Sequence, residues 1–447
     1  MKSDVVIIGA GMAGLATGAL LSKQGKRVTV LEKGNVAGGR AYCYEEKGFT
    51  LNYGAHAMYI PLSGPLAELM GRLGRSVPEC GYPEAMRSYW VHGDRFAAMG
   101  AKPHQVLTTK LFSIGGRMAL AKIMLAVRGE KTDRLPAELT WGEWIDAKTG
   151  DRAVREFMLA FGTVNSYTNP SADLSAAFFI GHLQRTLFAK DLVGYMYGGW
   201  RAMYDQWIED IEAGGGTIVT GERVDVLETS EGRIVAAVGG GTRHEADAFV
   251  CTLPPQDAPS IAAEGSDLRA EMLRWSTLDA VRAYCIDLGL SRPLRDDDAT
   301  FVFDVQRTLY YSIHSESAPD LAPAGGQLLH AMAYLTPDEA RDAALREGRG
   351  DELRAGLDRH FPGWKEAATV ERTMPDAKVL GARRTPENIK NLVPLRASSV
   401  QNLYFAGDSR DVPHSLTLAC LVSAMEVADA IETVPVRPET KAEAAAM

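Results

Sequence analysis

Cysteine is scarce in this chain, and no two cysteines have the spacing of a C-x-x-C pair. The chain has 447 residues, and its five cysteines are scattered along it: Cys43, Cys80, Cys251, Cys285 and Cys420. Disulfide scaffolds and structural zinc sites need paired or closely spaced cysteines. The sequence therefore argues against both and predicts free thiols in a reducing compartment, which indicates a cytoplasmic protein.

An excess of positive charge is also missing. Lysine and arginine together number 48 against 57 aspartates and glutamates, so the formal net charge is −9. Nucleic-acid binding depends on a basic face that neutralises phosphates, so nucleic acid is not expected as a partner. The hydrophobic share of 46% and the charged share of 23% are ordinary for a soluble globular protein. The length predicts two or three domain-sized units and leaves a homodimer open.

A convincing membrane-spanning run is lacking as well. The candidate at the N-terminus runs from Val5 to Leu21, seventeen residues without a charge. A transmembrane helix needs ~20 predominantly apolar residues. A signal peptide needs a cleavage site, whereas here the chain continues directly into the strand pattern "RVTVLEK". Both interpretations are weaker than the nucleotide-binding one that the glycines of this stretch support.

This opening stretch contains the glycine spacing G-x-G-x-x-G within a strand–helix–strand pattern. "DVVIIG" is a short β-branched run that predicts a buried parallel strand. "MAGLATGALLSKQG" predicts a helix that ends at Gly25, and "RVTVLEK" predicts the next strand. Together they form a βαβ unit of the expected ~30 residues.

The three glycines and one acidic residue of this unit have separate physical roles. Gly9 permits the tight turn, Gly11 lets the backbone approach a pyrophosphate, and Gly14 lets the helix pack closely on the strand. The helix N-terminus offers unpaired N–H groups to the phosphates. Glu32, at the end of the second strand, can accept hydrogen bonds from an adenosine ribose. These features predict a site for an ADP-containing dinucleotide without separating NAD from FAD.

Two further blocks of the chain have an α/β pattern. Trp200 to Ala213 predicts a helix whose apolar face holds Met203, Trp207, Ile208 and Ile211, and short strands with Gly-rich turns follow it. "QNLYFAGDSRDVPHSLTLACLVSAMEVADAI" predicts a strand, a turn and a long apolar helix. We therefore predict an α/β fold in which a Rossmann-like dinucleotide domain of three segments (1–80, 196–265, 376–434) is interleaved with an α+β substrate domain (81–195, 266–375), before a flexible tail (435–447).

Three motifs make the chain resemble the superfamily of FAD-dependent amine oxidases and phytoene desaturases. The first is the glycine fingerprint with Glu32. The second is "GGRA" at Gly38 to Ala41, followed by "LNYGAH" at Leu51 to His56. The third is "YFAGDS" at Tyr404 to Ser409, before the last helix. They follow the family's order along the whole chain, so the resemblance implies FAD as the cofactor.

The resemblance also implies roles for single residues. Arg40 would bind an FAD phosphate or lie beside the flavin, and Asp408 would hydrogen-bond the ribitol and pyrophosphate region. The backbone of Val224 would meet the adenine, and the last helix would direct its positive end at the flavin pyrimidine. The full set of residues that the resemblance places at FAD is Gly9, Gly11, Met12, Ala13, Gly14, Glu32, Lys33, Gly38, Gly39, Arg40, Gly54, Ala55, His56, Val224, Gly407, Asp408 and Leu416.

The reaction is inferred from features that the sequence does not show. None of "YGGW", "AGGGT", "VGGGT" and "PAGGQ" follows a strand and opens a helix, so a second dinucleotide site is not indicated and the substrate itself is the expected hydride donor. Amine oxidases of the superfamily typically have two aromatic rings and a lysine at the flavin. Here Leu416 replaces one ring, "KVLGARRTPENIKNLVPL" has no aromatic residue, and "LDAVRAYCIDLGLSRP" has no lysine.

These differences favour a dehydrogenase or desaturase that removes a hydride from a largely apolar small molecule, with oxygen, a quinone or another acceptor reoxidising the flavin. The alternatives are an amine or amino-acid oxidase, a non-catalytic FAD-binding protein and an isomerase that needs reduced flavin. His414 and His56 are the candidate polar groups on the substrate side. Tyr167 and Trp364 are candidates for the pocket wall, although aromatic residues more often belong to the core.

One basic and apolar stretch has a second interpretation. From Val106 to Val127, Lys110, Arg117 and Lys122 lie among Leu, Phe, Ile and Met residues, which predicts an amphipathic helix. Such a helix can lie on a membrane surface and admit a lipid-like substrate. The plainer interpretation is a helix of the substrate domain with a solvated basic face, and the sequence favours it.

Overall fold

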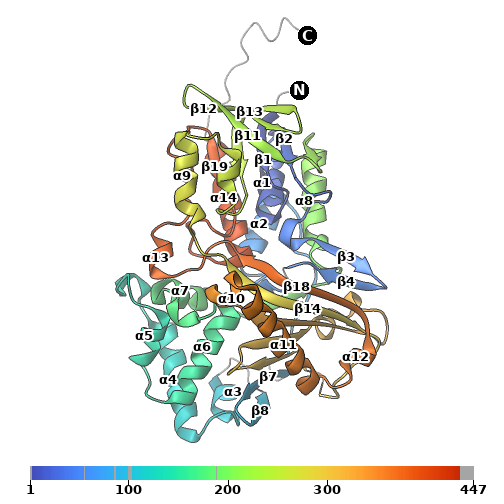
Figure 1. Ribbon diagram of the computed structural model, residues 1–447, viewed down its shortest axis with the longest axis vertical. Coiled ribbons are helices and arrows are strands. Elements are labelled where there is room, and N and C mark those ends of the chain that lie inside the picture. The colour runs from blue at the N-terminus through green and yellow to red at the C-terminus, as the bar shows by residue number, and fades with distance from the viewer. Residues whose placement is uncertain are drawn as a thin grey trace, which may run out of the picture.

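The computed structural model describes residues 3–54, 56–84, 87–98, 103–187, 189–297 and 299–432. Figure 1 shows that these residues form two bodies along the long axis of the molecule, each built on its own sheet. Ala55 and the predicted flexible tail at 435–447 lie outside the described residues.

The first sheet, in the upper body of Figure 1, gathers strands from three distant parts of the chain. Its centre is β1 (Ser3–Ile8), which pairs in parallel with β2 (Val28–Leu31) and β13 (Thr242–Cys251). β10 (Thr217–Val219) extends the parallel sheet beside β2, and β19 (Leu403–Phe405) extends it beside β13. This arrangement confirms the predicted Rossmann-like α/β domain made of three segments, while its segment boundaries stay a prediction.

An antiparallel meander leaves the edge of this sheet. β11 (Val224–Ser230) pairs with β12 (Arg233–Gly239), and β12 pairs with the first residues of β13. The last residues of β13 pair with β1 instead. The predicted short strands after the second-block helix are thus confirmed.

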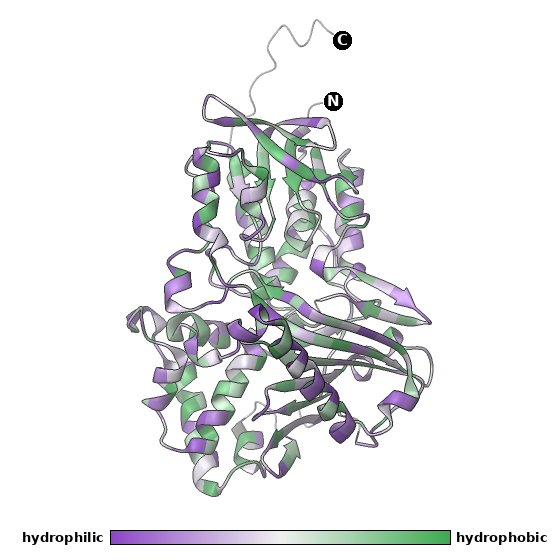
Figure 2. Cartoon of the chain, in the orientation of Figure 1, coloured by the Kyte–Doolittle hydropathy of each residue, from purple (hydrophilic) through white to green (hydrophobic). Residues whose placement is uncertain are grey.

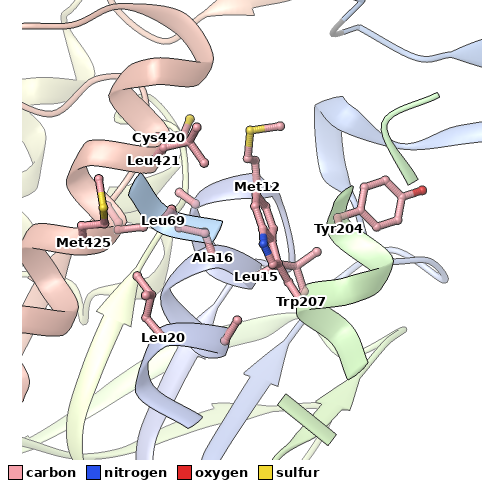
Figure 3. Packing of buried hydrophobic residues seen from close by; sticks show 14 of the residues in the cluster. Met12, Leu15, Ala16, Leu20, Leu69, Tyr204, Trp207, Cys420, Leu421 and Met425 are labelled. Carbon is pink, nitrogen blue, oxygen red and sulfur yellow. The ribbon is translucent and has the colours of Figure 1, made fainter. Parts of the chain in front are cut away.

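Three helices cover one face of the first sheet: α1 (Met12–Lys23), α8 (Arg201–Ala213) and α14 (Leu416–Glu432). Figure 3 shows how their apolar side chains pack together. In α8 the predicted apolar face is buried at Met203, Trp207 and Ile211. Every residue of α1 from Met12 to Ser22 is buried. The N-terminal stretch is therefore free of charge because a core surrounds it, as the mainly apolar colours of this layer in Figure 2 illustrate.

The second sheet forms the lower body and has the strand order β18-β14-β17-β16-β15-β7-β8 among the described residues. Neighbours pair antiparallel except for β15 and β7, which are parallel. Its strands are β7 (Ser88–His92), β8 (Arg95–Ala98), β14 (Val281–Leu290), β15 (Phe301–Asp304), β16 (Leu309–Ile313), β17 (Gln327–Tyr334) and β18 (Ala368–Leu380). Together with its helices it confirms the predicted α+β substrate-binding domain.

Helices from the first half of the chain pack together beside this sheet. They are α3 (Pro103–Thr108), α4 (Ile114–Gly129), α5 (Trp141–Asp146), α6 (Arg152–Ser166) and α7 (Ala176–Thr186). The prediction of one continuous helix from Val106 to Val127 was wrong, because the chain leaves the helical path after Thr108. The side-chain oxygen of Thr109 accepts the N–H of Leu111, and that of Ser113 accepts the N–H of Gly116, so local side-chain bonds replace helical ones.

Shorter elements complete the described fold. β3 and β4 form a hairpin, and β5, β9 and β6 form a small sheet. The remaining helices lie in both bodies. Their bounds are β3 (Cys43–Glu46), β4 (Phe49–Asn52), β5 (Met58–Tyr59), β6 (Cys80–Gly81), β9 (Val193–Met196), α2 (Pro65–Leu73), α9 (Asp267–Ser276), α10 (Pro337–Arg341), α11 (Ala343–His360), α12 (Trp364–Ala367) and α13 (Pro386–Ile389).

The structure also bears on two expectations about the whole chain. The five cysteines are free thiols, and all except Cys80 are buried. Among the described residues, none of the helices combines the length and the apolar character that crossing a membrane requires.

Candidate active site

The turn between β1 and α1 has the shape of a phosphate cradle. Gly9 has a φ of 103°, which favours glycine. A Cβ atom on Gly14 would overlap the carbonyl oxygen of Gly9, whereas one on Gly11 would meet no atom within 4 Å. No side chain caps the N-terminus of α1. Open space above Gly11 and an uncapped helix N-terminus, formed by Met12, Ala13 and Gly14, fit the pyrophosphate of a dinucleotide.

Two neighbouring segments close around this turn. The Glu32 carboxylate accepts the N–H of Ala10 at 2.8 Å and the N–H of Gly34 at 2.7 Å, so it lies at the turn where a ribose would bind. Gly38 donates its N–H to the carbonyl of Ala10, and a Cβ on Gly39 would lie 3.0 Å from the Cα of Gly11. The residues predicted to bind the ribose and the phosphates therefore lie close together.

Arg40 and Asp408 form an ion pair that connects the first and third segments of the dinucleotide domain. Arg40 Nη1 donates to Asp408 Oδ2 at 2.7 Å and to the carbonyl of Val379 at 3.0 Å. Burial alone raises the pKa of the Asp408 carboxyl, but Arg40 and the N–H of Gly381 outweigh burial and lower it. Burial lowers the pKa of Arg40, and Asp408 more than reverses that effect. Both groups are therefore charged and positioned together beside the glycine segments.

The other predicted cofactor residues lie at different places around the glycine turn and the ion pair. A Cβ on Gly54 would lie 3.1 Å from the carbonyl oxygen of Arg40, so the "YGAH" segment passes beside the ion pair. Gly407 and Leu416 both have positive φ, 144° and 53°, at the two ends of the loop that leads into α14. The N–H of Glu222 bonds to the carbonyl of Glu32, which places the start of β11, and hence Val224, near the ribose end. Lys33 is exposed beside Glu32.

The two predicted catalytic histidines belong to different side-chain clusters. Burial, with a smaller contribution from Arg185, lowers the pKa of His414 to about 4, and its Nδ1 is buried without a hydrogen-bond partner among the described residues. His182 on α7 has its pKa lowered to about 3 by burial first and then by Arg185 and His414. A small cavity lies between α7 and the start of α14, lined partly by Phe178, His182, Leu380, Arg384 and Ser415.

His56 lies in a second, more polar cluster. Its ring centroid is 3.9 Å from that of His330 and 4.8 Å from that of His314. His330 Nδ1 lies 2.6 Å from Asp287 Oδ1, and Arg372 donates from Nε and Nη2 to Asp287 Oδ2 at 2.9 and 2.6 Å.

Opposing effects act on the titration of this second cluster. Burial raises the pKa of Asp287, but His330, His56 and Arg372 together lower it by more. The pKa of Asp287 is therefore well below its ordinary value. Burial and then His330 lower the pKa of His56 to about 4. Burial also lowers the pKa of His314 well below its usual range.

Tyrosines, most of them buried, lie around the histidines of both clusters. The ring of Tyr195 lies 5.0 Å from that of His314, and the ring of Tyr59 lies 6.2 Å from that of His182. Tyr167, a predicted pocket residue, packs 5.8 Å from Tyr334. Burial raises the pKa of Tyr59, Tyr167, Tyr195 and Tyr334, so these hydroxyls keep their protons. Trp364 instead belongs to the core beneath α11 and bonds Asp358.

Sequence reasoning missed His182, Asp287, His314, His330 and Arg372. No short motif contains them. Only the register of the second sheet brings Asp287 to His330 and to Arg372, across 43 and 85 residues of sequence. The "YGAH" motif was the one available pointer, because it leads directly into the cluster at His56.

The fold and the residues around the glycine turn define a class of dinucleotide-binding α/β proteins, and the family to which the chain belongs makes it an FAD-dependent oxidoreductase. A family model described as flavin-containing amine oxidoreductase matches residues 12–432, so the chain belongs to that family. The phytoene dehydrogenase of Streptomyces griseus is 26% identical over 425 residues, covering 82% of this chain and 81% of that protein.

Two further comparisons show different extents of likeness. The all-trans-retinol 13,14-reductase of Macaca fascicularis is 49% identical over 55 residues, but the match covers only 12% of this chain and 9% of that reductase. The structure of an oxidoreductase from Methanosarcina mazei superposes with a TM-score of 0.80 at 22% identity, covering 96% of this chain and 100% of that one. At that identity the structural likeness supports the fold alone.

Proposed function

We propose that this chain is a dehydrogenase of the desaturase type, which removes a hydride from a carbon of a small, largely apolar molecule. The bound flavin supplies the two-electron acceptor at its N5. Oxygen, a quinone or another acceptor then takes the electrons. The glycine turn, Glu32, Arg40 and Asp408 would hold the cofactor, and the buried Tyr59, Tyr195 and Tyr334 would keep water from the reacting carbon.

One observation supports a substrate without a positive charge. Asp287, the carboxylate of the histidine cluster, is already occupied on both oxygens, by His330 and by Arg372. Because both oxygens already accept hydrogen bonds, a substrate ammonium group would have to compete with His330 or Arg372 for Asp287. A buried ammonium group without a carboxylate of its own would cost several kcal/mol of desolvation. An uncharged substrate avoids that cost.

An anaerobic screen of the flavin-loaded protein tests this proposal. We expect 1-octene or 1-octanol, which are apolar over most of their length, to bleach the flavin absorbance, and octylamine to do so much more slowly. Steady hydrogen peroxide production with octylamine, and no bleaching by the other probes, would contradict the proposal and favour an amine oxidase. Bleaching by none of the probes would also count against it.

We further propose that α4 rests on a membrane surface. Its outward face carries Ile114, Met118 and Leu125, whose exposed fractions are 76%, 61% and 68%. Lys110 and Lys122 are exposed beside this face, which suits an anionic bilayer. The basic charge is local, since the whole chain carries −9. A route from the lipid phase would suit a largely apolar substrate.

Co-sedimentation with vesicles that contain phosphatidylserine tests this surface. Met118→Gln with Leu125→Gln should release most of the bound protein, whereas the control Leu345→Gln, at a site 52% exposed on α11, should not. Equal binding of both variants would contradict a role for α4. A dimer in solution that the α4 variant separates would assign the face to a second copy of the chain instead.

A further inference from the structure

Four neighbouring strands of the second sheet each contribute one polar side chain to a single row. The register pairs Ser312 of β16 with His330 of β17, His330 with Asp287 of β14, and Asp287 with Arg372 of β18. Residues paired across neighbouring strands point to the same face of a sheet. We call these four residues the polar row. Its middle members, His330 and Asp287, are 1% and 3% exposed.

Asp287 determines which nitrogen of His330 carries a hydrogen. An ionised carboxylate only accepts hydrogen bonds, and its ion pair with Arg372 keeps Asp287 ionised. The 2.6 Å contact with Asp287 Oδ1 therefore requires a hydrogen on His330 Nδ1. In the neutral imidazole this leaves a lone pair, and no hydrogen, on Nε2.

The lone pair of His330 lies among other buried ring nitrogens that make no hydrogen bond, although His56 Nε2 lies 3.8 Å from Asp287 Oδ1. The Nε2 atoms of His56, His314 and His330 are all buried, and none bonds to a residue that the structure describes. A buried polar atom without a hydrogen bond costs about 1–3 kcal/mol. Three such atoms, in rings that lie 3.9 to 5.6 Å apart, form a place that a polar group of a ligand would satisfy.

We propose that His330 is the base that takes the proton from a hydroxyl group on the carbon that gives up its hydride, with Asp287 as its positioning residue. This inference rests on the proposed function and narrows its substrate to a largely apolar alcohol. The O–H bond breaks and its proton goes to His330 Nε2. The C–H bond breaks and its electron pair goes with the hydrogen to the bound flavin. A C=O double bond forms, so the alcohol loses two electrons and the flavin gains them.

The charges of the row suit this step. Taking a proton makes His330 an imidazolium ion, which the adjacent Asp287 carboxylate stabilises. The groups that face His330 are Asp287 on β14, His56 from the "YGAH" segment, His314 after β16 and Ser312 on β16. A hydroxyl is the group that most needs such a base, because it is a very weak acid and a neutral amine needs no deprotonation.

A metal ion is a less suitable occupant of the same place. His56, Asp287 and His330 offer ligand atoms within 4.8 Å of one another. However, Asp287 Oδ1 is bonded to His330, and the Arg372 guanidinium lies 2.6 Å from Asp287 Oδ2. A divalent cation would have to displace the hydrogen bond of His330 from Asp287 and would lie beside the positive charge of Arg372.

The tautomer of His330 can be measured without any substrate. In flavin-loaded protein with ¹⁵N-labelled histidine, we expect His330, identified through His330→Gln, to show a protonated Nδ1 and a bare Nε2 at neutral pH. Asp287→Asn should abolish that preference. A protonated Nε2, or a zinc ion that stays bound after dialysis and is lost in His330→Gln, would overturn the proposal.

Anaerobic flavin reduction then tests the reaction. The probes are 1-octanol, 2-octanol and 1-octene. With an alcohol, His330→Gln should lower the reduction rate by about 10²–10⁴-fold, while His92→Gln, on β7 of the same sheet, leaves it unchanged. Flavin content and thermal midpoint check that each variant folds.

The outcomes separate this inference from the proposed function. Flavin reduction by 1-octene but by neither alcohol would overturn the role of His330 and leave the proposed function standing. The same conclusion would follow if His330→Gln did not change the rate of flavin reduction by an alcohol. Reduction by none of the probes would count against the proposed function, and the tautomer would still decide whether His330 has the form of a base.

Discussion

The glycine turn between β1 and α1 occupies a few consecutive residues, whereas the polar row takes one side chain from each of four strands. In the turn the backbone forms the site and side chains must be absent: Gly9 leaves room for the Thr252 side chain, Gly14 leaves room for the carbonyl of Gly9, and the space above Gly11 is open. In the row, the side chains form the site and the backbone only sets the spacing between them. A substitution in the turn should therefore affect folding or cofactor binding. A substitution in the row should change the protonation state of its side chains.

Gly14→Val should have the largest effect. Its Cβ would overlap the carbonyl oxygen of Gly9, and neither backbone segment can move without separating α1 from β1. We expect a loss of more than about 4 kcal/mol in the free energy of unfolding, in the range of severe core substitutions. Chemical unfolding of the variant, or its failure to accumulate as soluble protein, measures this. A variant with near-normal stability would mean that the turn tolerates side chains.

Gly11→Val should keep the fold but lose the flavin. The added side chain enters open space in the apoprotein, so the thermal midpoint without flavin should barely change. The same space is where the pyrophosphate approaches the backbone. We expect flavin affinity to fall at least about a hundredfold, which is about 3 kcal/mol. Flavin absorbance after gel filtration checks this, and a variant that stays fully yellow would contradict the phosphate cradle.

The turn and the row also differ in how far the sequence could predict them. The β1–α1–β2 unit was predicted because its signals are local: a β-branched run, three glycines and Glu32 all lie within 30 residues of chain. The apolar face of α8 was predicted for the same reason, because helical spacing repeats within one segment. Asp287, by contrast, lies in the apolar strand "VRAYCIDLGL", and nothing in the sequence of that strand indicates that His330 lies beside it. Pairing between distant strands is a property of the folded sheet, so the row was missed.

The histidines around the row should supply part of the pH dependence of stability, beside His182 and His414, whose pKa values burial also lowers. The folded-state pKa of His56 is lowered to about 4 from 6.5, mainly by burial and then by His330. The unfolded chain therefore binds a proton before the folded one does, and stability present above pH 6.5 is lost as the pH falls from 6.5 to 4. His56 should account for about 3 kcal/mol of that loss.

Unfolding of His56→Asn across this pH range checks the assignment. Between pH 6.5 and 4 the variant should lose less stability than the wild type, and His244→Asn, in the dinucleotide domain, should follow the wild type. If the stability of His56→Asn falls with pH as steeply as that of the wild type, His56 does not cause the loss of stability at low pH. The expected difference between the row and the turn would then be wrong.

Ser312→Ala should have the smallest effect and tests whether the polar row acts as one unit. Ser312 is fully buried, and its hydroxyl lies 2.8 Å from the hydroxyl of Tyr195. Removing one partner of a buried neutral hydrogen bond costs about 1 kcal/mol, whereas the exposed control Ser260→Ala should cost close to nothing. Flavin content and the tautomer of His330 should stay unchanged, because Asp287 alone holds the Nδ1 hydrogen. A variant that changes that tautomer would show that Ser312, although it does not bond His330, helps to set its protonation, and the row would then be a single coupled network.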